Sequence, residues 1–127
     1  MKRVVLAIKN GLVLEAVSNA LKRGGFLVTK TSSQEVQEIL NLTNSLLAHL
    51  LIMDVGKSED CTFDKRMDIV KLIKNQNPNI KIAFLVDNVS NKNDAYKIKC
   101  VKEEGKIDTF FYESVPSDYI VDVLDSL

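Results

Sequence analysis

Leu50-Leu51-Ile52-Met53-Asp54 is the stretch that decides the fold. Four consecutive apolar residues without alternation are typical of a strand that is buried on both faces of a parallel sheet. Val4-Val5-Leu6-Ala7-Ile8 is a second run of this kind, and 80–86 is a third. Because such strands need helices on both faces, we expect strands and helices to alternate along the chain.

The remaining segments supply this alternation. Further strands are expected at 26–29 and 107–112, and helices at 12–22, after Ser32, between 66 and 78, at 91–104 and at 117–127. Ser32 with Glu35 has the form of a capping box, and Gly24-Gly25 and Gly105 are expected to end helices. The residues expected to face the core from the second and third helices are Val36, Ile39, Leu40, Leu46 or Leu47, Ile69, Val70, Leu72 and Ile73. The pattern predicts a doubly wound sheet of five parallel strands.

Length and composition indicate one domain, 1–127, with a proper core. The chain has 17 basic and 17 acidic residues, and a balanced charge argues against direct nucleic-acid binding. No apolar run is long enough to cross a membrane, the N-terminus is unlike a signal peptide, and Cys61 and Cys100 predict two reduced thiols. A cytoplasmic location is the resulting expectation.

The charge is unevenly distributed. Residues 1–30 hold six bases and one acid, whereas residues 108–127 hold five acids and no base. Asp118, Asp122 and Asp125 share one stripe of the last predicted helix, and Lys97, Lys99 and Lys102 make the preceding helix basic. Both stripes are consistent either with solvated surfaces or with a charged interface.

Sites in an open parallel sheet form at the carboxyl ends of its strands. The polar and terminal residues expected at that edge are Lys9, Asn10, Asp54, Val86, Asp87 and Tyr112. Asp54 is the most informative of them, because it is an acid placed directly after an apolar strand. His49, the single histidine, precedes that strand and is expected to be structural.

Over its full length the chain resembles the receiver domain of two-component response regulators. The resemblance rests on the strand–helix order and on Leu21-Lys22-Arg23-Gly24-Gly25-Phe26, Leu50-Leu51-Ile52-Met53-Asp54, and Gly105 with Asp108-Thr109-Phe110-Phe111. It implies a flavodoxin-like fold with strand order 2-1-3-4-5, a histidine kinase or downstream effector as partner, no enzymatic activity, and Asp54 at the phosphoacceptor position.

Several positions depart from the receiver pattern. Lys9-Asn10 stand where the family has a pair of acids that hold Mg²⁺, Val86 where it has Ser or Thr, and Tyr112 where it has Lys. Mg²⁺ requires oxygen ligands, and an ammonium about 4 Å from Asp54 would favour the carboxylate by about 4 kcal/mol at an effective dielectric near 20 while repelling a divalent ion. We therefore expect an incomplete site, no metal, and an ion pair between Lys9 and Asp54.

Other interpretations stay open at this point. A phosphorylation-competent site could use Lys9 to neutralise a phosphoryl oxygen and Asp87 as a second acid, and it would then need Mg²⁺ at Asp54. Asp54 could also be a solvated acid at a strand end. A small flavodoxin-like cofactor-binding domain is the third alternative, but no Gly-rich phosphate loop is present and Lys9-Asn10-Gly11 does not supply one. We expect no bound cofactor.

The resemblance also suggests a partner surface. Receiver domains commonly pair through the fourth helix, the fifth strand and the fifth helix. A two-fold dimer there would place the basic helix with Lys97, Lys99 and Lys102 against the acidic helix with Asp118, Asp122 and Asp125 of the other copy.

Overall fold

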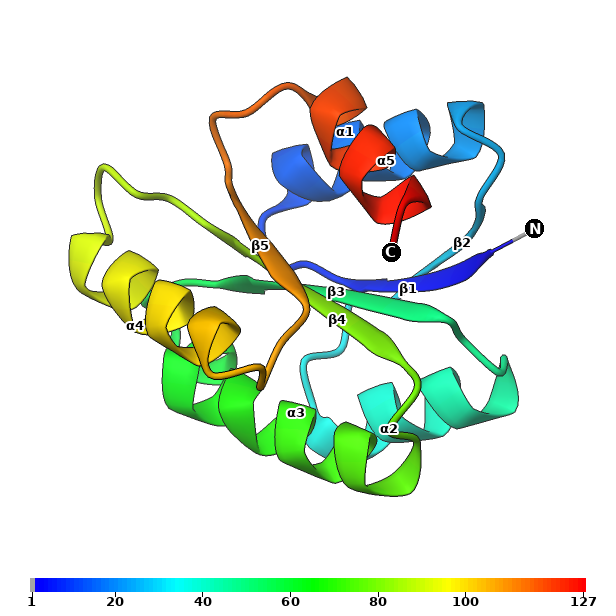
Figure 1. The fold of residues 1–127 in the computed structure, drawn as a ribbon, viewed down its shortest axis with the longest axis horizontal. Helices are drawn as coiled ribbons and strands as arrows, with labels where there is room; N and C mark the ends of the chain where they lie inside the picture. Colours follow the sequence, from blue (N-terminus) through cyan, green and yellow to red (C-terminus); the bar gives the residue numbers. More distant parts are fainter. Residues whose placement is uncertain (1) are drawn as a thin grey trace.

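A single sheet of five parallel strands runs through the middle of the molecule (Figure 1). The structure, a computed structural model, describes residues 2–127. The strands lie in the order β2-β1-β3-β4-β5, and their bounds are β1 Arg3–Ala7, β2 Leu27–Lys30, β3 Leu50–Val55, β4 Lys81–Val86 and β5 Thr109–Tyr112. The doubly wound sheet and the order 2-1-3-4-5 are confirmed.

Helices cover both faces of the sheet. Figure 1 shows α1 and α5 on one side and α2, α3 and α4 on the other. Their bounds are α1 Gly11–Arg23, α2 Val36–Ser45, α3 Phe63–Gln76, α4 Lys92–Glu103 and α5 Ser117–Asp125, with a short 3-10 turn at Glu59–Cys61. No helix in the described part of the chain is both long and apolar enough to cross a membrane.

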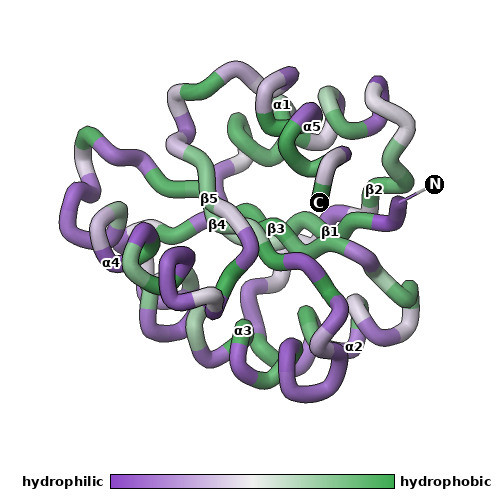
Figure 2. The backbone as a smooth tube through the Cα atoms, viewed as in Figure 1, coloured by the Kyte–Doolittle hydropathy of each residue, from purple (hydrophilic) through white to green (hydrophobic). Residues whose placement is uncertain are grey.

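The buried strands contribute side chains to two separate cores, because successive side chains of a strand point to opposite faces of the sheet. Val5 and Met53 pack with α2, α3 and α4, whereas Leu6 and Ile52 pack with α1 and α5. Figure 2 shows the resulting hydrophobic strands between helices that carry mixed surfaces. β3 is buried over its whole length and thus places Asp54 at the end of the central strand.

Two details of the predicted helices are wrong, the capping box and the inward position of Leu72. The segment after Ser32 is not a capping box, since α2 begins only at Val36 and no side chain caps its first turn. Leu72 does not face the core, since it is 43% exposed. Of the alternatives Leu46 and Leu47, Leu46 packs against the core and Leu47 is 71% exposed. Leu47 follows the end of α2 with φ 51°, so the chain has already turned away from the helix there.

The predicted helix ends at the glycines have two different physical causes. Gly25 and Gly105 adopt φ values of +88° and +79°, the left-handed conformation that favours glycine. Gly24 has an ordinary φ of −80°, but a Cβ there would lie 2.6 Å from Cγ1 of Val121. Gly24 therefore permits the close approach of α1 and α5.

Candidate functional site

The carboxyl ends of the strands surround a cavity of about 320 Å³. Lys9 and Asn10 follow β1, Asp54 and Val55 are the last two residues of β3, and Asp87 follows β4. Further lining residues include Lys57, Ser58, Cys61, Ser90, Asn91 and Glu113. The structure thus brings together four of the six residues that the sequence places at this edge.

Asp54 is buried, with only 4% of its surface exposed. Its Oδ1 accepts hydrogen bonds from the backbone N–H of Lys9 at 2.9 Å and from Arg66 Nη2 at 3.0 Å. Its Oδ2 accepts one from the backbone N–H of Asn10 at 3.0 Å. A carboxylate offers about four acceptor positions, so these three bonds use most of them. Asp54 is therefore not a solvated acid at a strand end.

Arg66, in the first turn of α3, is completely buried. Its Nε donates to the backbone oxygen of Asp54 at 2.8 Å. The two N–H groups of its Nη2 are shared among Asp54 Oδ1, the backbone oxygen of Ala7 at 3.0 Å and Gln34 Oε1 at 2.6 Å. Burial lowers the pKa of the guanidinium and Asp54 raises it. An arginine stays charged in proteins, so Arg66 is a fixed cation beneath Asp54.

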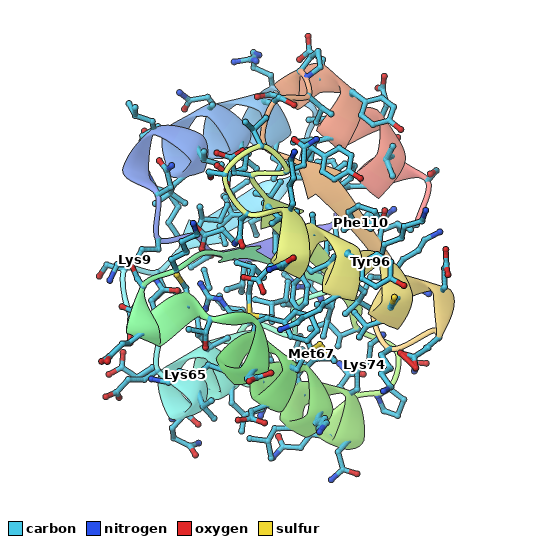
Figure 3. The ribbon with its side chains drawn as sticks, turned by 90° about the vertical axis from the view of Figure 1, so that its left-hand side faces the viewer. Lys9, Lys65, Met67, Lys74, Tyr96 and Phe110 are labelled. Atoms are coloured by element: carbon cyan, nitrogen blue, oxygen red, sulfur yellow. The ribbon has the colours of Figure 1, made fainter. Side chains whose placement is uncertain are left out.

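The Lys9 ammonium does not pair with Asp54, and this prediction is wrong. Lys9 Nζ donates instead to Asp60 Oδ2, and both side chains are roughly half exposed. This hydrogen bond raises the pKa of Lys9 and lowers the pKa of Asp60. Figure 3 shows Lys9 at the outer edge of the molecule, where a long side chain reaches solvent. Arg66 is the cation that pairs with Asp54, from the interior side.

The other acids at the cavity are held in different ways. Asp87 accepts hydrogen bonds from the backbone N–H of Val89 at 2.9 Å and from Ser90 Oγ at 2.9 Å, and these bonds lower its pKa. Glu113 is partly buried, and burial followed by the charges of Asp54 and Asp87 raises its pKa. Asp87 thus fixes the turn before α4, while Glu113 adds negative charge at the mouth of the site.

Val86 and Tyr112 do not line the cavity. Val86 is fully buried in the core beneath α4, and Tyr112 packs against the same core. Tyr112 also contacts Phe110 edge-on, with ring centroids 5.6 Å apart. Both side chains point to the face that α2, α3 and α4 cover. Val86 alternates with Leu85 along β4, and Tyr112 alternates with Phe111 along β5; Leu85 and Phe111 pack on the α1–α5 face, where Phe111 contacts Tyr119. Neither brings a hydroxyl or an ammonium group to Asp54.

The site does not fit Mg²⁺. Both oxygens of Asp54 already accept hydrogen bonds, and one accepts from a buried guanidinium. Within residues 2–127, no three acidic, histidine or cysteine side chains converge on a point that could hold a metal ion. Arg66 would repel a second cation at this position. The repulsion is strong because the site is poorly solvated and charges there are weakly screened.

The thiols and the histidine have structural surroundings. Cys61 lines the cavity, and burial raises the pKa of its thiol, which makes it a poor nucleophile. Cys61 and Cys100 are both free. His49 Nδ1 accepts a hydrogen bond from the backbone N–H of Arg3 at 2.9 Å and so joins the start of β1 to the start of β3.

The charged residues of the predicted partner surface lie on α4 and α5, which flank β5 on opposite faces of the sheet (Figure 1). The Lys97 ammonium lies 5.8 Å from the ring centroid of Phe63, and Asp118 makes a long contact of 3.8 Å with Arg23. The other charged residues of the predicted surface, Lys99, Lys102, Asp122 and Asp125, are exposed, and so are Lys92 and Glu103 of α4. A partner could reach these residues.

No family model and no curated protein sequence matches the chain. Solved structures do match it. They include a receiver-domain protein from Clostridium thermocellum (16% identity, TM-score 0.78, 99% of this chain and 93% of that one) and a CheY-like protein, TadZ, from Pseudomonas aeruginosa PAO1 (16%, TM-score 0.77, 99% and 98%). The chain has the fold of response-regulator receiver domains. Response regulator TrrA from Thermotoga maritima, solved with Mg²⁺ and BeF, matches this receiver fold at 17% identity and TM-score 0.75 over 99% and 98%.

The sequence reasoning missed Arg66, Gln34, Asp60 and Glu113. Arg66 left a detectable signal, because position 66 precedes Ile69, Val70 and Ile73 at the three- and four-residue spacing of the buried stripe of α3. A basic residue on an apolar stripe predicts a buried partner. The other three residues lie in loops or next to a strand end, where periodicity gives no information.

Proposed function

We propose that this receiver-like domain is a non-enzymatic signalling module of the two-component type that does not accept a phosphoryl group and acts by binding another protein. The observation that carries the proposal is the environment of Asp54. Its carboxylate is buried, neutralised by Arg66 and bonded by the N–H groups of Lys9 and Asn10.

Phosphoryl transfer depends on positioning and on neutralising the charge of the transferred group. In this cavity the guanidinium of Arg66 neutralises the ground-state carboxylate from the interior side, and the Lys9 ammonium is engaged by Asp60. The neighbouring acid Glu113 would repel an incoming phosphate. The arrangement therefore stabilises a free, ionised Asp54 and opposes both an approaching anion and a divalent cation.

A phosphorylation-competent site is the alternative, and one feature favours it. The cavity beside Asp54 is open and includes Lys57, a cation with no described ion-pair partner within residues 2–127. Movement of Lys57 toward Asp54 would supply part of the missing positive charge.

Intact-mass spectrometry distinguishes the two functions. The protein is incubated with acetyl phosphate and Mg²⁺, and Asp54→Asn serves as the matched control. We expect the mass of each protein to be the same before and after treatment. A mass increase of one phosphoryl group in the wild type that Asp54→Asn abolishes would contradict the proposal. Titration with Mg²⁺ alone, followed by ¹⁵N amide shifts of Lys9 and Asn10, tests the metal separately.

The partner surface follows from the exposed charges of α4 and α5. We propose that a protein partner, or a second copy of this chain, contacts the basic α4 residues Lys97, Lys99 and Lys102 or the acidic α5 residues Asp118, Asp122 and Asp125. In a two-fold dimer each protomer would place its basic helix against the acidic helix of the other. The variant Asp122→Lys/Asp125→Lys should then weaken self-association in sedimentation velocity. A monomer at all salt concentrations would exclude the dimer and leave the binding of another protein.

A further inference from the structure

Arg66 connects Asp54 to a part of the fold outside the cavity. The same nitrogen, Nη2, donates to Asp54 Oδ1 at 3.0 Å and to Gln34 Oε1 at 2.6 Å. Gln34 lies in the irregular segment 31–35 that joins β2 to α2. We infer that Gln34 acts as a latch that couples the charge of Asp54 to the position of α2.

The latch is the side-chain hydrogen bond that joins this segment to α3. Ser33 N–H donates to Thr31 Oγ1 and Gln34 Nε2 donates to the backbone oxygen of Ser32, so both of these bonds stay within the segment. Among the residues that the structure describes, no side chain caps the first turn of α2. In the described part of the chain, Gln34 makes the one side-chain hydrogen bond from residues 31–35 to another element.

The segment also has room to move. Its outer side borders an open cavity of about 580 Å³ between the amino-terminal ends of α2 and α3. Gln34 and Val36 form one wall, and Lys65 and Ile69 of α3 form the opposite wall. Figure 3 shows Lys65 on α3, at the end of the molecule that carries the site. A loss of the Gln34–Arg66 bond can therefore release the segment without displacing packed side chains.

Within residues 2–127, no side-chain hydrogen bond runs from Asp54 toward α4 and β5. Val86, at the end of β4, is apolar, and the Tyr112 ring packs away from the cavity. Asp87, in the loop before α4, bonds to Val89 and Ser90 of its own turn. A change at Asp54 thus reaches α2 through side-chain hydrogen bonds, whereas it reaches Asp87 and Glu113 only through space, by charge. This coupling goes beyond the proposed function and does not depend on whether Asp54 accepts a phosphoryl group.

The first test perturbs the latch and observes the site. Gln34→Ala and Gln34→Glu are compared with Gln37→Ala, a matched control that borders the same cavity but bonds only to Asn41. The readout is the ¹⁵N–¹H shift of the Lys9 and Asn10 amides, which donate to Asp54. Both Gln34 variants should move these two signals, and Gln37→Ala should not. Unchanged signals, or equal changes in all three variants, would overturn the coupling.

The second test perturbs the site and observes the two helices. The amide of Ile39 donates to the backbone oxygen of Glu35 at the start of α2, and the amide of Ala95 donates to that of Asn91 at the start of α4. In Asp54→Asn, hydrogen exchange at the Ile39 amide should accelerate about tenfold relative to the Ala95 amide. A tenfold change corresponds to the low end of the free energy lost with a hydrogen bond to a charged group. Equal acceleration at both amides, or a larger effect at Ala95, would refute the proposal.

Discussion

Replacing Arg66 by Met tests the buried ion pair on which the site depends. Methionine keeps an unbranched side chain in the interior but removes the cation that lies 3.0 Å from Asp54 Oδ1. Asp54 would then keep only its two backbone N–H donors, from Lys9 and Asn10. Removing one partner of a buried pair costs about 3–5 kcal/mol because the other charge stays buried.

The size of this loss is measurable. A domain of this kind has a total stability of about 5–15 kcal/mol. At about 2.1 cal/mol/K per residue, the unfolding entropy of 127 residues is about 0.27 kcal/mol/K, so Arg66→Met should lower the Tm by about 10–20 °C. Urea unfolding followed by circular dichroism gives the free energy directly. Lys65→Met, which removes the neighbouring exposed cation, should stay within about 0.5 kcal/mol of wild type.

A double variant separates the ion pair from simple loss of packing. Arg66→Met/Asp54→Asn removes both charges, and it should be more stable than the sum of the single variants predicts by about 1–3 kcal/mol. Additive free energies, together with a cost below about 1 kcal/mol for Arg66→Met, would refute the conclusion that a buried ion pair holds this site.

Three further predictions concern other contacts. The pKa of Glu113 is raised in the folded protein, so ionisation of this side chain destabilises the folded state as the pH rises through the raised pKa. Glu113→Gln should therefore raise the urea midpoint at pH 7 and leave it unchanged below pH 4.5, the ordinary pKa of the group. Gly24→Ala should destabilise by about 1–3 kcal/mol in the same assay, since its Cβ would lie 2.6 Å from Val121 Cγ1. Lys2→Met should cost about 0.3–1 kcal/mol, because the Lys2 ammonium bonds to carbonyl oxygens at the carboxyl end of α5, and hydrogen exchange should show the last turn of α5 loosening.

The partial success of the site prediction has a simple geometric reason. The carboxyl ends of parallel strands lie at one edge of the sheet, so the residues at or just after the ends of β1, β3 and β4 had to meet there, and Lys9, Asn10, Asp54 and Asp87 do. Side-chain direction was not available from that argument. Tyr112 lies on the core side of β5, and the cavity is reached by the next residue, Glu113.

The apolar runs of the sequence alone determined the sheet, its helical cover and the place of Asp54 at the end of the central strand. These features follow from local periodicity, because a strand buried on both faces is readable as an unbroken apolar run. Tertiary structure decided which cation pairs with Asp54. Lys9 is the neighbour of Asp54 along the sheet edge, but its long side chain points outward and pairs with Asp60. Arg66 extends from α3 into the interior, where it is fully buried and pairs with Asp54. A charge that cannot reach water must find its partner inside, and only the packing of α3 on the sheet specifies that partner.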